Sequence, residues 1–219
     1  METPLTGNER LLLIDTCGET AGVALCKGQQ VLATEDLTRG SASAQIITAV
    51  RSLLSQVGWS IAELEAVGVV SGPGSFTGMR TGLAAAKGLC ESAGLPLAAV
   101  SRLEVLANAA GLLDGFVALE AGRDEVYVLD IQSGRESLCS SEGIAVLCAG
   151  KSLAVAEERV AERLASCEPV LCPLHVRDAL QAVLRRLREG GSDVSMVDAN
   201  YVRKESDMYP KPPMPSGAA

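Results

Sequence analysis

The stretch VVSGPGSFTGMRTGLAAAKGL, residues 69–89, joins an apolar, β-branched run to a helical run through a glycine-rich hinge. The run AVGVVS (66–71) predicts a buried strand, and the residues after the hinge predict a helix that ends near Ser92. In a loop between a strand and a helix, backbone N–H groups and the helix dipole favour anions. The question is therefore whether this loop binds a ligand or takes part in catalysis, or only positions the helix that follows.

The loop SGPGSFTG (71–78) differs from the common catalytic loops. It lacks the Gly-Lys-Ser/Thr ending of a phosphate-binding Walker A loop, and Arg80 is the nearest cation. Ser75 does not fit a nucleophile elbow, because Pro73 and Thr77 stand where that motif needs glycines. The alternative is a tight turn that needs glycine backbone angles, with Ser75 or Thr77 capping the helix.

Outside the hinge, the apolar spacing predicts alternating strands and helices. Strands are expected at 10–16, 22–26, 31–37, 66–71, 97–100, 115–120, 125–131, 143–150 and 169–172, and helices at 42–58, 77–92, 101–110, 152–166 and 176–191. The segments SIAE (60–63) and SRLE (101–104) have the pattern of capping boxes. This order indicates an α/β fold with a mixed sheet, compatible with two related lobes, although the residues show no internal repeat.

Composition narrows the class of protein. The chain has 219 residues, 47% of them hydrophobic, and a formal net charge of -8. Phosphate-backbone binding depends on Lys and Arg, so we expect the chain alone to bind nucleic acid poorly, while an acidic adaptor in a nucleic-acid-processing complex stays open. The seven cysteines form no C-x-x-C and lie mostly in apolar runs, which is typical of a reducing compartment. The N-terminus does not resemble a signal peptide and no apolar run approaches about 18 residues, so we expect a cytoplasmic protein without membrane contact.

Few residues offer catalytic chemistry. His175 is the single histidine, which argues against a Ser–His triad and against a zinc or iron enzyme. In IDTCGET (14–20), an Asp at a strand end would hold Mg²⁺ or water beside phosphate in a kinase-like ATPase, and the alternative is a capped β-turn. The candidate phosphate-binding residues of this turn and of the hinge are Asp15, Gly18, Thr20, Gly72, Gly74 and Ser75.

The helices at 42–58 and 77–92 predict a partner surface. Small residues four apart on the second helix allow another helix to approach closely, and the alternative is packing on the protein's own sheet. The two helices carry more apolar residues than one narrow stripe needs, so we expect part of them to remain exposed. Without a partner, the same surface would pair two copies about a two-fold axis. The expected interface residues are Ile46, Ile47, Val50, Leu53, Leu54, Met79, Gly82, Leu83 and Ala86.

Three segments together, LLLIDTCGETAGVAL, AVGVVSGPGSFTGMRTGLAAAKGL and PLAAVSRLEVLA, resemble the bacterial TsaB family, also called YeaZ. The likeness is strong over residues 11–110, and EVYV (125–128) and NYVRK (200–204) extend it weakly. The resemblance implies an actin-like (ASKHA, ribonuclease H-like) fold with mixed sheets flanked by helices. It implies an N-terminal lobe at 1–112 and a reduced second lobe at 113–205. The residues at 206–219 lack periodicity and predict a disordered tail, which is free or packs back on the first lobe.

The resemblance also implies a function. TsaB proteins are glycoprotease-like adaptors that help to make N6-threonylcarbamoyladenosine at position 37 of tRNA, without being the catalyst. The expected partners are the TsaD paralogue, which holds the metal and the threonylcarbamoyl-adenylate, and the ATPase TsaE. ATP and metal would therefore belong to those subunits, this chain would bind no cofactor, and tRNA would be met only through the complex. The lone His175 agrees, because the metal-binding His pair of TsaD has no counterpart.

The chain departs from the family pattern at two places. The helix start GSASAQII (40–47) has no histidine, and Glu120 and Gly122 replace residues of an Asp-Ala-Arg motif, with Arg123 one place later. The second departure weakens any nucleotide contact from that loop. The alternatives left open are an autonomous actin-like nucleotide-using enzyme and, last, a peptidase.

Overall fold

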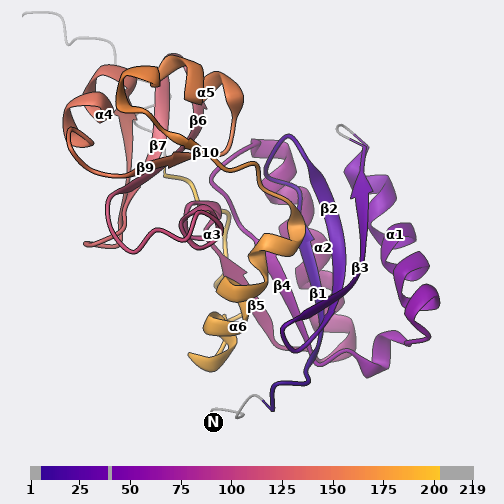
Figure 1. Cartoon of the computed structure of the whole chain (residues 1–219). Helices are drawn as coiled ribbons and strands as arrows, with labels where there is room; N and C mark the ends of the chain where they lie inside the picture. The colour runs from indigo at the N-terminus through magenta and orange to yellow at the C-terminus, as the bar shows by residue number, and fades with distance from the viewer. Residues whose placement is uncertain (1–5, 39–40, 203–219) are drawn as a thin grey trace, which may run out of the picture.

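Two five-stranded mixed sheets, each flanked by helices, make up the computed structural model, which describes residues 6–38 and 41–202 (Figure 1). The first sheet has the order β3-β2-β1-β4-β5. Its strands are β1 (Arg10–Asp15), β2 (Ala21–Lys27), β3 (Gln30–Leu37), β4 (Ala66–Val70) and β5 (Leu97–Val100). β2 runs antiparallel to β1 and β3, whereas β4 runs parallel to β1 and β5.

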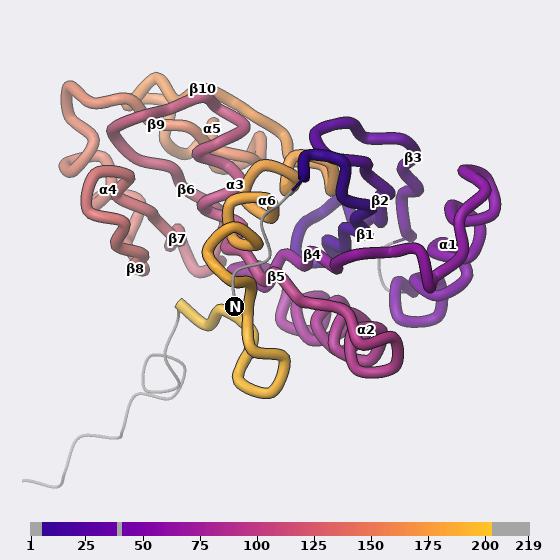
Figure 2. Tube along the Cα trace, turned by 90° about the horizontal axis from the view of Figure 1, so that it is seen from below, coloured from indigo at the N-terminus to yellow at the C-terminus, as the bar shows by residue number. Residues whose placement is uncertain are grey.

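Helices cover both faces of the first sheet. α1 (Ala42–Val57) packs on β2 and β3, and α2 (Phe76–Ala93) packs on β4 beside α1. Figure 2 shows α6 (Leu180–Arg188) on the opposite face from α2. α6 lies so close to β4 that a Cβ on Gly68 would stand 2.5 Å from a methyl carbon of Val183. The glycine inside the buried run AVGVV is therefore required by the approach of a helix.

The second sheet repeats the topology of the first. Its order is β10-β9-β6-β7-β8, where β7 is antiparallel to β6 and β8, and β9 is parallel to β6 and β10. Numbered from its own first strand, this is again 3-2-1-4-5. The strands are β6 (Phe116–Gly122), β7 (Glu125–Asp130), β8 (Arg135–Ser140), β9 (Leu153–Val155) and β10 (Val170–Leu171). The predicted α/β, two-lobed fold with mixed sheets is confirmed, and its duplication is visible only in three dimensions.

The chain crosses between the lobes twice. α3 (Arg102–Ala109) leads from the first sheet to β6, and α4 (Ser141–Leu147) and α5 (Glu158–Arg163) flank the second sheet. The chain then returns through the 3-10 turn η3 (Val176–Ala179), which packs on β1 and β2, to α6 on β5. η3 and α6, which belong to the second lobe as predicted, thus pack on the first sheet. The lobe boundaries at 112 and 205 stay a prediction. The predicted tail at 206–219 lies outside the described residues.

Two predicted elements of the second lobe were wrong. The segment 143–150 was expected as a strand, but residues 143–147 lie in α4, whose N-cap Ser140 accepts a hydrogen bond from the Gly143 N–H. Residues 152–166, expected as one helix, split into the buried strand β9 and the short helix α5, because β9 pairs with both β6 and β10. Edge strand β8 was not predicted, since its sequence RESLCS has little apolar signal. The short apolar runs here are ambiguous, and tertiary pairing decides them.

The two predicted capping boxes differ in outcome. At the 3-10 turn η1 (Ile61–Glu63), the side chains of Ser60 and Glu63 form the complete box. At α3, Ser101 Oγ accepts from the Leu103 N–H as an N-cap should, but the Glu104 carboxylate pairs with Arg185 of α6 instead. Among the described helices, none has the length and apolar character that crossing a membrane requires.

Candidate functional site

The hinge loop and the β1–β2 turn bind each other. The Ser75 N–H donates to the Cys17 carbonyl at 2.8 Å, and Thr16 Oγ1 donates to the Gly78 carbonyl at 2.6 Å. A Cβ on Gly74 would lie 2.3 Å from the Cys17 carbonyl oxygen, so this contact requires glycine. The structure thus brings together the two loops predicted to bind phosphate, and several of their polar groups satisfy one another.

The hinge also sets the start of α2. Gly72 has φ +111°, a backbone conformation that favours glycine, and its carbonyl accepts from the Arg102 N–H at 2.6 Å. Ser75 is the N-cap, and its Oγ accepts from the Gly78 N–H at 3.2 Å. These contacts hold the loop at the start of α2, and whether it also binds an anion stays a prediction.

Asp15 ends β1 and is buried. Its Oδ1 accepts from the Cys17 N–H at 2.8 Å. This bond forms the capped β-turn that the sequence offered as the alternative to a metal-holding Asp. Burial raises the pKa of this carboxyl above its ordinary value, and the nearby Arg102 charge acts in the opposite direction. Thr20, at the far end of the turn, donates from Oγ1 to the Leu174 carbonyl at 2.7 Å.

A buried ion pair joins the two lobes beside this turn. Arg102 Nη1 lies 3.0 Å from Glu157 Oε1, and the two side chains are 7% and 6% exposed. Arg102 begins α3, and Glu157 follows β9 at the N-cap of α5. Glu157 Oε2 also accepts from the Glu120 N–H at 3.2 Å. A Cβ on Gly18 would stand 2.5 Å from Arg102 Nη2, so the guanidinium fills the space above the turn.

The sequence patterns did not predict this pair. Its two members are 55 residues apart in the chain, and the sequence patterns placed each of them inside a different predicted helix. The one signal in the sequence was that Arg102 and Glu157 flank two apolar runs that become strands of different sheets.

Further charges connect the tip of the β6–β7 hairpin to α5. Glu120 Oε2 lies 3.3 Å from Arg159 Nε and 3.2 Å from Arg163 Nη1. Arg159 also reaches Glu19 in the β1–β2 turn at 3.5 Å, although both of these side chains are more than half exposed. Glu120, one of the departures from the TsaB pattern, is therefore held by ion pairs with α5.

The predicted partner residues on α1 and α2 require a correction. Eight of them are buried: Ile46, Val50, Leu53, Leu54, Met79, Gly82, Leu83 and Ala86. Ile47 alone among the nine is exposed, at 43%. The stripe of small residues serves the protein's own sheet, because a Cβ on Gly82 would lie 2.4 Å from Thr16 Oγ1.

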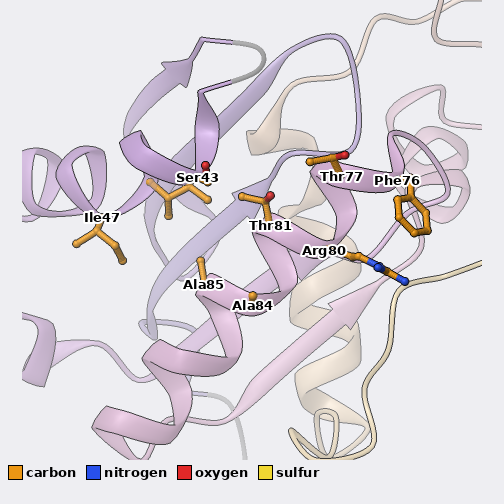
Figure 3. Close-up of a pocket in the computed structure, with 9 residues that line it drawn as sticks. Ser43, Ile47, Phe76, Thr77, Arg80, Thr81, Ala84 and Ala85 are labelled. Carbon is orange, nitrogen blue, oxygen red and sulfur yellow. The ribbon is translucent and has the colours of Figure 1, made fainter.

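The exposed surface between α1 and α2 lies on their outer side. A groove of about 660 Å³ runs there between the helices (Figure 3). We call it the α1–α2 groove; its lining is Ser43, Ile46, Ile47, Phe76, Thr77, Arg80, Thr81, Ala84 and Ala85. Phe76 is 49% exposed at one end, with the Arg80 guanidinium 4.0 Å from its ring centre. Arg80 Nε donates to the Tyr201 hydroxyl at 2.7 Å, which ties the C-terminal segment to the end of the groove.

Metal-type clusters do not form among the described residues, where no group of three or more His, Cys, Asp and Glu side chains converges. His175, the single histidine of the chain, stands at the N-cap of η3. Its backbone N–H donates to Asp178 Oδ2 at 2.7 Å. His175 therefore begins a helical turn.

Comparison with known proteins places the chain in a family. The model of the family TsaD, described as tRNA N6-adenosine threonylcarbamoyltransferase, matches residues 37–194. The tRNA threonylcarbamoyladenosine biosynthesis protein TsaB of Escherichia coli is 34% identical over 137 residues, which are 61% of this chain and 59% of that protein. The Bacillus subtilis TsaB is 38% identical over 121 residues, 53% of this chain and 52% of that protein. The matches span little more than half the length of these curated relatives.

Solved structures of YeaZ-type proteins also resemble this chain. YeaZ from Pseudomonas aeruginosa superposes with a TM-score of 0.70 at 27% identity, covering 86% of this chain and 97% of that one. A second Pseudomonas aeruginosa protein, described as uncharacterized and similar to peptidase YEAZ, gives a TM-score of 0.73 at 28% identity over 89% of this chain and 100% of that chain. The predicted resemblance to TsaB and YeaZ is confirmed.

Proposed function

We propose, starting from the fact that this chain belongs to the TsaD family of tRNA N6-adenosine threonylcarbamoyltransferases, that it is the TsaB-type adaptor of threonylcarbamoyladenosine synthesis and not the catalyst. In this proposal it pairs with a TsaD-type paralogue in the cytoplasm. The paralogue holds the metal and the threonylcarbamoyl-adenylate, a TsaE-type ATPase joins the pair, and tRNA is met through the complex.

The observation that carries the proposal is the α1–α2 groove. Ile47 on α1 and Phe76 at the start of α2 both line this groove and expose 43% and 49% of their surface, so the groove offers apolar surface to a partner. Ala84 and Ala85, between them on α2, are small enough to let a partner helix approach closely. A paralogue with the same fold would offer its own pair of helices, so the two pairs would pack together. Without the paralogue, a second copy of this chain would use the same surface.

The space between the lobes supports a non-catalytic role. In a kinase-like relative of this fold, the turn after the first strand and the hairpin of the second lobe would face a nucleotide phosphate. Here Arg102 lies against Gly18 of that turn and is neutralised by Glu157. Glu120 of the hairpin is paired with Arg159 and Arg163. The charges that would meet phosphate are thus engaged with one another.

A second candidate is an autonomous actin-like nucleotide-using enzyme, favoured by the description of the matching family as a transferase. In that case Asp15 would hold a metal or water beside phosphate. Its burial and its bond to the Cys17 N–H favour the adaptor. A peptidase, the label carried by one solved relative, has the least support because the chain has one histidine and no nucleophile elbow.

Co-purification with a TsaD-type paralogue tests the adaptor role. Ile47→Glu and Ala84→Glu place a charge in the α1–α2 groove and should weaken binding at least about tenfold, which corresponds to about 1.4 kcal/mol. Val146→Glu is the matched control, because Val146 is 77% exposed on α4, away from the groove. Normal binding by both groove variants would show that the partner surface lies elsewhere.

Activity assays on the purified chain distinguish the second candidate. We expect no ATP hydrolysis, no peptide cleavage and no tRNA modification by the chain alone. Steady ATP turnover that disappears in Asp15→Ala would favour the nucleotide-using enzyme over the adaptor. Asp15→Asn is the control for folding, because it removes the charge and keeps the volume of the side chain.

A further inference from the structure

Residues 199–201, close to the end of the described chain, cross the hinge that precedes α2. We call them the C-terminal strap. Ala199 is buried, and the Asn200 N–H donates to the Ser71 carbonyl at 2.8 Å. A Cβ on Gly72 would stand 3.4 Å from the Asn200 carbonyl oxygen, so the strap lies directly against the hinge.

Tyr201 binds the start of α2. Its hydroxyl accepts from Arg80 Nε at 2.7 Å, and its ring centre lies 5.8 Å from that of Phe76. The Arg80 guanidinium carbon is 4.0 Å from the centre of the Phe76 ring and 5.9 Å from that of the Tyr201 ring, so the cation contacts both aromatic rings. Figure 3 shows Phe76 and Arg80 together at one end of the α1–α2 groove. The strap therefore supports the groove at that end.

The side chain of Asn200 binds the second lobe. Its Nδ2 donates to Glu136 Oε2 at 2.8 Å, and Glu136 belongs to β8, an edge strand of the second sheet. The other carboxylate oxygen, Glu136 Oε1, accepts from Ser101 Oγ, the N-cap of α3. Hydrogen bonds to a carboxylate are stronger than those between neutral groups. One carboxylate of the second lobe thus binds the strap and the first lobe together.

This cluster adjoins the buried ion pair between the lobes. Ser101 and Arg102 are consecutive residues at the start of α3, and they bind carboxylates from different segments of the second lobe. Ser101 binds Glu136 on β8, and Arg102 binds Glu157 after β9. The second lobe therefore holds the start of α3 at two points, and the strap is part of one of them.

We propose that the C-terminal strap is a coupling device, which links the end of the α1–α2 groove to the edge of the second lobe. Tyr201 and Asn200 are adjacent residues, and the backbone of Asn200 is bound to Ser71. Loss of the bond between Arg80 and Tyr201 therefore loosens the anchor of Asn200 on β8. This inference goes beyond the proposed function, because it is a property of the chain alone. A partner that covers Phe76 and Arg80 would act on the second lobe through the strap.

Hydrogen exchange of the full chain, followed by mass spectrometry, tests the coupling. Arg80→Ala removes the donor to the Tyr201 hydroxyl and should speed exchange in the peptide covering 135–140 by about threefold to tenfold, as the loss of one hydrogen bond predicts. Arg51→Ala, the same change at an exposed position of α1, is the matched control and should leave this peptide unchanged. Asn200→Ala should speed its exchange directly, and adding Arg80→Ala to it should have no further effect. Light scattering on each sample keeps self-association from being mistaken for coupling.

Tyr201→Phe keeps the ring and removes the hydroxyl, so it should reproduce part of the effect of Arg80→Ala. Unchanged exchange in β8 of the Arg80→Ala chain would overturn the proposal, as would fully additive effects of Arg80→Ala and Asn200→Ala. Equally faster exchange in β4 would indicate a general loss of stability and would also overturn it. Because the chain is measured alone, a negative result leaves the proposed function standing, and loss of the proposed function leaves the coupling measurable.

Discussion

Removing Glu157 should destabilise the protein strongly, because the loss leaves a buried charge behind. Glu157→Ala deprives the Arg102 guanidinium, whose side chain is 7% exposed, of its partner. Breaking a buried ion pair in this way costs about 3–5 kcal/mol. The upper end applies, because the Glu120 N–H loses its acceptor as well. For a chain of this size, about 2–4 °C per kcal/mol predicts a melting temperature lower by about 10–20 °C.

Urea unfolding at neutral pH measures the effect. Far-UV circular dichroism follows both lobes, and the single tryptophan, Trp59, reports on the first. The double replacement Arg102→Met with Glu157→Leu removes both charges and retains volume, so it should recover most of the loss. The control Glu189→Gln removes an exposed partner of Arg186 and should change the free energy of unfolding by less than about 1 kcal/mol.

Two results would refute this reasoning. A cost below about 1 kcal/mol for Glu157→Ala would mean that water reaches Arg102 and that the pair does not hold the lobes together. A double replacement as unstable as the single one would mean that packing, and not an unpaired charge, accounts for the loss.

Four further predictions follow from burial and charge. Gly82→Ala should lower the urea midpoint, because its Cβ would stand 2.4 Å from a hydroxyl oxygen, whereas Gly88→Ala, with open space around it, should add about 0.5–1 kcal/mol. Ala86→Arg should prevent folding, because Ala86 is fully buried, and a native circular dichroism spectrum would contradict this; Ala84→Arg, on the exposed face, should fold normally. Burial raises the pKa of Asp15 above 3.8, so its contribution to stability is complete below pH 3.8 and is lost as pH rises through the folded value; urea titrations should show Asp15→Asn gaining on the unaltered protein over that rise. With a net charge of -8, the isolated chain should show no salt-sensitive tRNA binding in gel shifts at physiological ionic strength, and tight binding would argue against the adaptor.

The sequence predicted the strand–hinge–helix unit well because its determinants are local. The β-branched run of β4, the left-handed backbone at Gly72 and the cap at Ser75 each act within a few residues. The same holds for the β6–β7 hairpin, where Arg123 and Asp124 both take positive φ in the turn. The resemblance to TsaB was readable for the same reason, since it rests on this unit.

In the second lobe the local signal was insufficient. The run at 143–150 and the start of 152–166 are short apolar segments that fit a strand or a helix equally well. β9 is a strand because β6 and β10 offer it hydrogen bonds on both sides, and those partners lie outside any local window.

The sequence by itself determined which residue types lie on α1 and α2, and that apolar and small residues recur there at helical spacing. Only the tertiary structure decided that Ala86 and Gly82 face the protein's own sheet, while Ile47 and Phe76 face outward. Periodicity gives a helix an apolar side but does not say how much of that side one sheet will cover. The meeting of Arg102 with Glu157, 55 residues away, has the same cause: charges become partners through the topology that brings two sheets together, and no local pattern encodes that distance.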